Sequence, residues 1–198
     1  MGKKRVVITG LGALTPIGNN VSDYWSNLIK GVSGADHITR FDASLFKTQF
    51  ACEVKGFDPE SIMSRKEARK LDLFSIFAMA TAKEAMEDSK LDLEKINLDR
   101  AGVIWGSGIG GLKTFQEECF NYKDGDGTPR FNPFFIPKMI VDIAAGHISM
   151  KYGLRGPNYV TVSACASSTN ALIDALMLIQ LGKSDVIVTG GSEAAVNI

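Results

Sequence analysis

Cys165 is the side chain with the clearest chemical potential in this sequence, because of the residues around it. A β-branched and aromatic run over 159–162 precedes it and favours a strand. It lies within six consecutive small residues, 163–168, and a nearly uncharged run of helical length follows, from Thr169 to Leu181, closed by Gly182. The pattern places the thiol at a strand-to-helix junction, at or just before the amino end of a helix. Apolar residues on almost every face predict that this helix is buried.

A cysteine at such a junction is suited to nucleophilic chemistry. The unpaired amides and positive dipole end of a helix start favour a thiolate and can hold an oxyanion. Small neighbours would let a substrate reach the sulfur. A buried, inert core cysteine is the alternative, and both readings stay open because a catalytic cysteine also needs a base. His37 and His147 are the only histidines, and the sequence places neither beside Cys165; His147, in an apolar helix, is expected to be a core residue.

Composition narrows the class of protein. The 198 residues suffice for one α/β domain, and 22 basic residues balance 22 acidic ones, so no nucleic-acid or membrane-surface partner is indicated. Apolar runs are too short for a membrane span, and the amino terminus lacks the apolar core of a signal peptide. Three cysteines at unrelated spacings predict free thiols in a reducing cytoplasm, without a disulfide frame or a metal site.

Strands and helices are expected to alternate along the chain. The predicted strands cover residues 5–9, 101–105, 159–162 and 185–189, with an edge strand around 49–54. The predicted helices cover 22–30, 64 to about 88, 112 to about 122, a segment ending at Tyr152 and 169–181. The helix from Ser64 begins with a capping box that Glu67 completes. Such alternation predicts a mostly parallel sheet with helices on both faces.

Glycines after the second main strand offer a competing interpretation. Gly106, Gly108 and Gly111 fit the G-x-G-x-x-G pattern of nicotinamide oxidoreductases. The region some twenty residues further on, around Asp126, is a Gly/Pro-rich loop rather than a strand ending in an acidic ribose ligand. Glycines that allow tight turns and close packing are therefore the favoured interpretation. The acidic run Asp124–Gly127 lacks the ligand series of a calcium loop and predicts a turn.

Three basic residues, Lys66, Arg69 and Lys70, share one helix face by their spacing. On this spacing alone a solvated basic face is favoured over a docking patch for an acidic partner.

Six segments together resemble the β-ketoacyl-[acyl-carrier-protein] synthases, in particular the elongating enzymes of bacterial type II fatty acid synthesis. They are Val7–Gly18, Ser64–Lys70, Gly106–Gly111, Asn132–Phe135, Tyr152–Pro157 and Ser163–Ser168. The resemblance implies a thiolase-like fold of two similar α/β halves, a homodimer and no cofactor. It implies transfer of an acyl chain from acyl carrier protein to a cysteine. Condensation with malonyl carrier protein would then give a 3-oxoacyl product.

The resemblance also implies roles for particular residues. Cys165 matches the acyl-accepting cysteine, and its amide would be one of two oxyanion donors. Gly108 and Ile109 match the acyl pocket, with Ile109 as its gate, and Phe135 matches an aromatic that reaches the partner subunit's pocket. The basic patch (Lys66, Arg69 and Lys70) matches positions that meet the carrier protein, which reverses the preference given above.

Family members have a second half that supplies two histidines, a lysine and a Gly-Phe loop. We therefore expect residues 1–198 to be the amino-terminal half of a cytoplasmic synthase, inactive and poorly soluble alone because its interface would be exposed. The alternative is a non-catalytic subunit that binds carrier protein. Such relatives usually replace the cysteine, so the presence of Cys165 argues against it.

Overall fold

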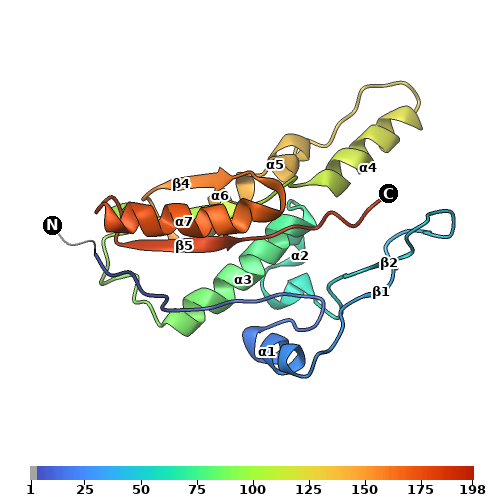
Figure 1. Cartoon of the computed structure of the whole chain (residues 1–198). Helices are drawn as coiled ribbons and strands as arrows, with labels where there is room; N and C mark the ends of the chain where they lie inside the picture. Colours follow the sequence, from blue (N-terminus) through green and yellow to red (C-terminus); the bar gives the residue numbers. More distant parts are fainter. Residues whose placement is uncertain (1–3) are drawn as a thin grey trace.

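A three-stranded parallel sheet lies at the centre of the computed structural model, which describes residues 4–198. Its strand order is β4-β3-β5, with bounds Asn158–Thr161, Ala101–Gly106 and Val186–Gly191 (Figure 1). Every residue of β3 is buried, as expected for the central strand of a covered parallel sheet. Because the strands are parallel, their carboxyl ends meet at one edge.

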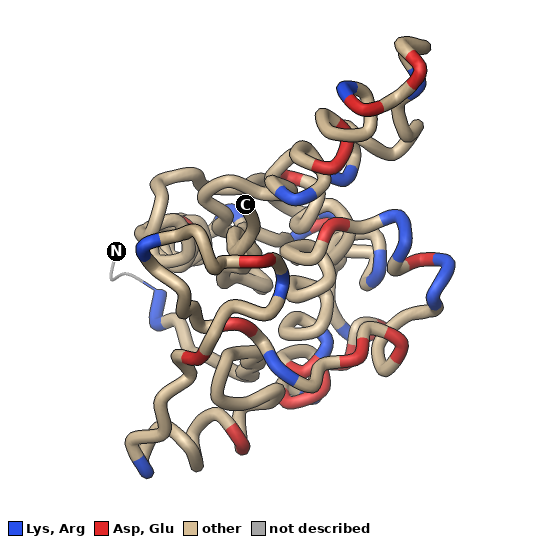
Figure 2. Tube along the Cα trace, turned by 90° about the vertical axis from the view of Figure 1, so that its right-hand side faces the viewer, with Lys and Arg blue, Asp and Glu red and all other residues tan. Residues whose placement is uncertain are grey.

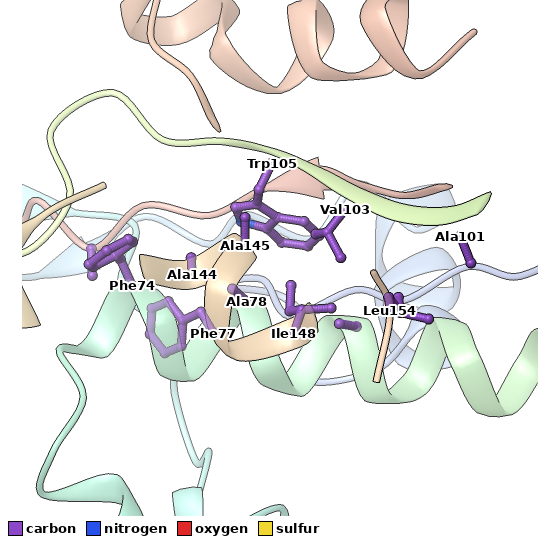
Figure 3. Packing of buried hydrophobic residues seen from close by; sticks show 12 residues of the cluster. Phe74, Phe77, Ala78, Ala101, Val103, Trp105, Ala144, Ala145, Ile148 and Leu154 are labelled. Carbon is purple, nitrogen blue, oxygen red and sulfur yellow. The ribbon is translucent and has the colours of Figure 1, made fainter. Parts of the chain in front are cut away.

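Helices cover both faces of this sheet. They are α3 (Leu73–Ser89) and α6 (Ile143–Tyr152) on one face and α7 (Ser167–Gln180) on the other. Along β3, Val103 and Trp105 join the core under α3 and α6 (Figure 3), while Ile104 between them packs on Ala171 and Ala175 of α7. This alternation follows from the two-residue period of a strand. The predicted α/β class, with helices on both faces of a parallel sheet, is confirmed.

The other elements are short. They are α1 (Val21–Ile29), β1 (Asp36–His37), β2 (Phe50–Ala51), η1 (Pro59–Ser61), α2 (Arg65–Ala68), η2 (Leu98–Arg100), α4 (Leu112–Lys123), α5 (Phe135–Met139) and η3 (Ala164–Ala166). Helices α4 and α5 form an arm that projects from the body of the molecule (Figure 1). The predicted edge strand is reduced to β2, which pairs antiparallel with β1. No helix within residues 4–198 is long and apolar enough to cross a membrane.

The predicted strand over residues 5–9 is wrong. Residues 4–14 pair with no strand and run beside α3 instead, where carboxylates replace a strand partner. Asp88 accepts the Leu11 amide at 2.9 Å and Glu84 accepts the Ala13 amide at 2.8 Å. Gly12 permits this approach, since a Cβ there would lie 2.0 Å from the Thr81 carbonyl oxygen.

The single helix predicted from Ser64 to about residue 88 is in fact two helices. The capping box is confirmed: Glu67 accepts the Ser64 amide at 2.9 Å, and Ser64 Oγ accepts the Glu67 amide at 3.3 Å. The chain then breaks after α2, because buried Asp72 caps α3 through the Phe74 amide and also accepts the Thr114 hydroxyl at 2.5 Å. A carboxylate with a distant partner thus sets the start of α3.

The prediction that the helix after Cys165 is buried rather than on the surface is wrong for one side of that helix. Ala171 and Ala175 of α7 are buried against the sheet. Four apolar side chains on α7 are between 42% and 49% exposed: Leu172, Ile173, Leu176 and Met177. The sheet covers one side of α7, and no other part of the described chain covers the rest. The predicted glycine stop is confirmed, since Gly182 has φ +70°.

Candidate active site

A cavity of about 580 Å³ lies where the three parallel strands end. Its lining comes from the segments after β3, β4 and β5: Gly106, Ser107, Gly108 and Ile109; Ala164, Cys165, Ser167 and Ser168; Gly191, Ser192, Glu193 and Ala195. The structure therefore brings together three of the predicted site residues, Cys165, Gly108 and Ile109. A ligand site at the carboxyl ends of strands is typical of parallel α/β folds.

A tight turn presents Cys165 between β4 and α7. Hydroxyl groups pin this turn: Ser167 Oγ accepts the Ser163 amide at 2.9 Å and donates to the Ala164 carbonyl at 2.7 Å, and Thr161 Oγ1 donates to the Ser167 carbonyl at 2.7 Å. Ala164 has φ +48°, a left-handed conformation that costs a non-glycine residue roughly 1–2 kcal/mol. The surrounding hydrogen bonds maintain that conformation, and it aims the next residue, Cys165, at the cavity.

The position of Cys165 at a helix start is confirmed. The residue lies in η3, which runs directly into α7, and its side chain is exposed. The alternative of a buried, inert cysteine is therefore wrong. Neither helix start is capped by a side chain. The Ala166 and Ser167 amides donate to the carbonyls of Ser163 and Ala164, which leaves the Cys165 amide to donate to an oxygen bound in the cavity.

Gly106 allows α7 to start close to the sheet. A Cβ on this residue would lie 2.5 Å from the carbonyl carbon of Ser167 and 2.5 Å from the amide nitrogen of Ser168. No side chain fits between the end of β3 and the first turn of α7. The close-packing interpretation of the glycine pattern holds at this position.

Glu193 is a cavity residue that the sequence analysis missed. Its Oε2 atom accepts the amide of Gly108 at 2.6 Å and the amide of Ile109 at 3.1 Å. Just before it, Ser192 accepts the indole N–H of Trp105 at 2.9 Å, which ties the end of β5 to β3. An acidic residue two positions after a strand of a parallel sheet was the sequence feature that could have indicated it.

Neither histidine lines the cavity. His147 lies in α6, across the sheet from α7, and partial burial lowers the pKa of its imidazole below the ordinary value. His37 is exposed in β1. Of the side chains that could accept a proton, the cavity lining holds the Glu193 carboxylate and neither histidine. Within residues 4–198, no three His, Cys, Asp or Glu side chains gather into a possible metal site.

The remaining predicted site residues lie outside the cavity. Lys66, Arg69 and Lys70 are exposed on and just after α2, and none forms an ion pair with an acidic side chain of the described residues. Lys70 Nζ lies 5.5 Å from the centroid of the Phe134 ring. Elsewhere, basic and acidic residues are interspersed over the molecule (Figure 2). Phe135 stacks on Phe131 in the α4–α5 arm, with ring centroids 6.0 Å apart.

Comparison with known proteins decides the family. The family model described as "Beta-ketoacyl synthase, N-terminal domain" matches residues 3–198. The chain belongs to the β-ketoacyl synthase family. The predicted resemblance is confirmed, and the nicotinamide oxidoreductase interpretation is wrong.

Relatives in this family are longer than the chain. It is 46% identical over 193 residues to 3-oxoacyl-[acyl-carrier-protein] synthase 2 of Staphylococcus aureus strain COL, covering 98% of this chain and 46% of that protein. The synthase 2 of Synechocystis gives 46% identity over 194 residues with the same coverages. The solved ishigamide ketosynthase/chain length factor superposes with a TM-score of 0.87 at 27% identity, covering 98% of this chain and 48% of that one. The chain spans about half the length of these relatives.

Proposed function

We propose that this β-ketoacyl synthase chain forms the acyl-accepting part of a 3-oxoacyl-[acyl-carrier-protein] synthase, with Cys165 as the nucleophile. One observation carries the proposal: the Cys165 thiol is exposed in a cavity at a helix start, where three parallel strands end. The names of the Staphylococcus and Synechocystis relatives support the substrate class.

The first step is a thioester exchange. Cys165 loses its proton, and the sulfur attacks the carbonyl carbon of an acyl thioester on the carrier protein. The oxyanion that forms accepts a hydrogen bond from the Cys165 amide. When the tetrahedral intermediate collapses, the bond to the carrier sulfur breaks, the carrier thiolate leaves and takes up a proton, and the acyl chain remains on Cys165. Gly108 and Ile109 would flank that chain, since both line the same cavity.

The second step is a decarboxylative condensation. Malonyl carrier protein loses carbon dioxide, and the carbanion attacks the acyl-Cys165 carbonyl, which expels the Cys165 thiolate and gives a 3-oxoacyl chain two carbons longer. The family resemblance assigns this step two histidines, a lysine and a second oxyanion donor from another half of the enzyme. Because neither His37 nor His147 lines the cavity, we expect residues 1–198 alone not to elongate acyl groups.

Partners follow from the surface. The basic patch (Lys66, Arg69 and Lys70) is exposed, free of ion pairs within residues 4–198, and suited to an acidic carrier protein. Phe135, on the projecting arm, would reach the pocket of a second subunit in a homodimer. The cytoplasm, where fatty acid synthesis supplies both carriers, is the proposed location.

The test is a condensation assay on the chain joined to the carboxyl-terminal half of the Staphylococcus relative. With acyl and malonyl carrier proteins we expect a 3-oxoacyl product, and with acyl carrier protein alone an acyl group on the enzyme. Cys165→Ser should abolish both, while Cys119→Ser, in α4, should keep both. Carrier binding without any acyl transfer would instead favour the non-catalytic partner subunit.

A further inference from the structure

Glu193 makes an unusual contact for an exposed side chain beside a nucleophile. One oxygen, Oε2, accepts two consecutive amides, those of Gly108 and Ile109, at 2.6 and 3.1 Å. Consecutive amides that converge on one anion form a concave backbone site, and hydrogen bonds to a charged acceptor are about twice as strong as neutral ones. The carboxylate thus occupies a site made by the backbone of the loop after β3, inside the cavity of Cys165.

Other bonds hold the rest of this loop. The Gly111 amide donates to the Met139 carbonyl at 2.9 Å, and the Gly110 amide donates to Ser107 Oγ at 3.2 Å. Between these anchors, the backbone of Gly108 and Ile109 is fastened by Glu193. The Ile109 side chain lines the cavity and is 49% exposed, so protein atoms cover only part of it. Its position therefore depends on how its backbone is held, and Glu193 holds that backbone.

The backbone before Glu193 is hydrogen-bonded to the sheet. Glu193 follows β5, whose end is tied to β3 by the Ser192 amide, which donates to the Gly106 carbonyl at 3.0 Å. A Cβ placed on Gly108 would lie 3.0 Å from Glu193 Oε2 and 3.5 Å from the Ala164 Cα atom. Gly108 therefore lies close to both the carboxylate and the turn that presents Cys165, so a shift of the loop changes the surroundings of the thiol.

We propose that Glu193 is a positioning residue for substrate selection: its carboxylate fixes the backbone of Gly108 and Ile109, and so holds the Ile109 side chain where it limits the length of apolar chain that reaches Cys165. The proposal rests on the acyl-binding role proposed for this cavity. It adds a specificity determinant just after β5 that acts through a neighbouring loop and does not touch the reacting atoms.

Alkylation of Cys165 tests this on the chain itself, without carrier protein or a second half. Iodoacetamide and N-dodecyliodoacetamide are compared in separate reactions, and peptide mass spectrometry gives the rate at each cysteine. Cys119 is the internal reference for reagent behaviour, because it is exposed in α4, outside the cavity. In Glu193→Ala we expect the dodecyl-to-parent rate ratio at Cys165 to rise at least about threefold, as Ile109 is released. Glu193→Gln, which keeps an acceptor oxygen, should restore most of the wild-type ratio.

The matched control is Glu94→Ala, an exposed glutamate in a different surface loop, which should leave the ratio unchanged. Hydrogen exchange of the peptide covering 106–111 provides a second readout, expected to be faster in both Glu193 variants and slowest in the wild type. If Glu193→Ala does not fold, the Gln variant and its exchange rate decide. An unchanged ratio in Glu193→Ala, or unchanged exchange of residues 106–111 in the Glu193 variants, would overturn the proposal, even where wild-type Cys165 accepts acyl groups. Failure of acyl transfer in the condensation assay would instead refute the proposed function.

Discussion

Cys165 is one of three free, exposed thiols, so exposure alone does not distinguish it. Cys165 differs from the other two in its position. It follows a turn with a left-handed residue that Ser167 fixes, it lies at a helix start without a side-chain cap, and it lines a cavity formed mostly by small residues. Cys119, in the middle of α4, has none of these features. Reactivity is therefore predicted from backbone geometry rather than from access.

Replacement of the nucleophile gives the first prediction. We expect Cys165→Ser to reduce acyl transfer by roughly 10³-fold or more, because a hydroxyl is far less acidic than a thiol and a much weaker nucleophile at neutral pH. Carrier binding should persist, since the basic patch (Lys66, Arg69 and Lys70) is separate from the cavity. Transfer rates from radiolabelled acyl carrier protein measure the first effect, and fluorescence anisotropy of labelled carrier measures the second. Comparable loss in Cys119→Ser would contradict this assignment.

His147 gives a prediction about pH. Burial lowers the pKa of its imidazole in the folded state below the ordinary value of about 6.5, so the unfolded chain binds the proton more readily. Stability from this group is present above about pH 6.5 and is lost as the pH falls through that value toward the folded pKa. Urea midpoints between about pH 5 and pH 8 should show a shallower loss in His147→Gln than in the wild type. Parallel profiles would refute a contribution from this residue.

At the scale of elements, the meeting of β3 with α7 determines the site. We expect Gly106→Ala to destabilise the fold by about 1–3 kcal/mol and to slow alkylation of Cys165, because the new Cβ would displace the first turn of α7. Gly146→Ala is the matched control. A Cβ added to Gly146 would lie 3.9 Å from its nearest neighbour, an Ile143 side-chain carbon, so it fits without a clash. Because alanine favours a helix more than glycine does, we expect this variant to be more stable by up to about 1 kcal/mol. Chemical denaturation and iodoacetamide kinetics check both variants.

Local sequence patterns predicted most of these elements. They failed where a residue distant in sequence determines where an element begins or whether it forms. The buried run of β3 and the capping box at Ser64 are local and were predicted. The break before α3 was not, because the carboxylate that causes it is fixed by Thr114, 42 residues away. Residues 5–9 have strand propensity but no strand beside them, and the carboxylates of α3 accept amides of the residues that follow.

The candidate site follows the same division. The position of Cys165 at a helix start could be predicted, because the strand, the small residues and the helix are consecutive in the sequence. The roles of Gly108 and Ile109 came from the family resemblance, and the cavity brings them beside Cys165. Glu193 was missed because its partners lie 84 and 85 positions away, across the sheet edge.

For the whole molecule, the net charge is zero although the basic patch is locally positive. Replacing Lys66, Arg69 and Lys70 with Glu reverses the charge of the patch. It should weaken the binding of acyl carrier protein about tenfold or more and make the dissociation constant less dependent on salt concentration. Reversing exposed Lys30, Lys47 and Lys123 changes the net charge equally at other places, so it serves as the control and should have a much smaller effect. Titration at low and high salt compares them. Equal losses in the two triple variants would show that only net charge matters.

The exposed side of α7 leads to a prediction about assembly. Its apolar residues Leu172, Ile173, Leu176 and Met177 form a face that water disfavours. We expect the chain alone to self-associate, and joining it to the second half of a relative to suppress this. Sedimentation velocity over a concentration series checks both forms. A stable monomer at high concentration would show that this face needs no cover.

Acylation at one sulfur is the most direct test of the central claim. The chain, joined to the carboxyl-terminal half of the Staphylococcus relative, is incubated with hexadecanoyl carrier protein, digested at acidic pH and examined by peptide mass spectrometry. The account predicts the hexadecanoyl mass on the peptide that contains Cys165, removable by hydroxylamine. An acyl group on Cys52 or Cys119 with Cys165 unmodified would contradict it.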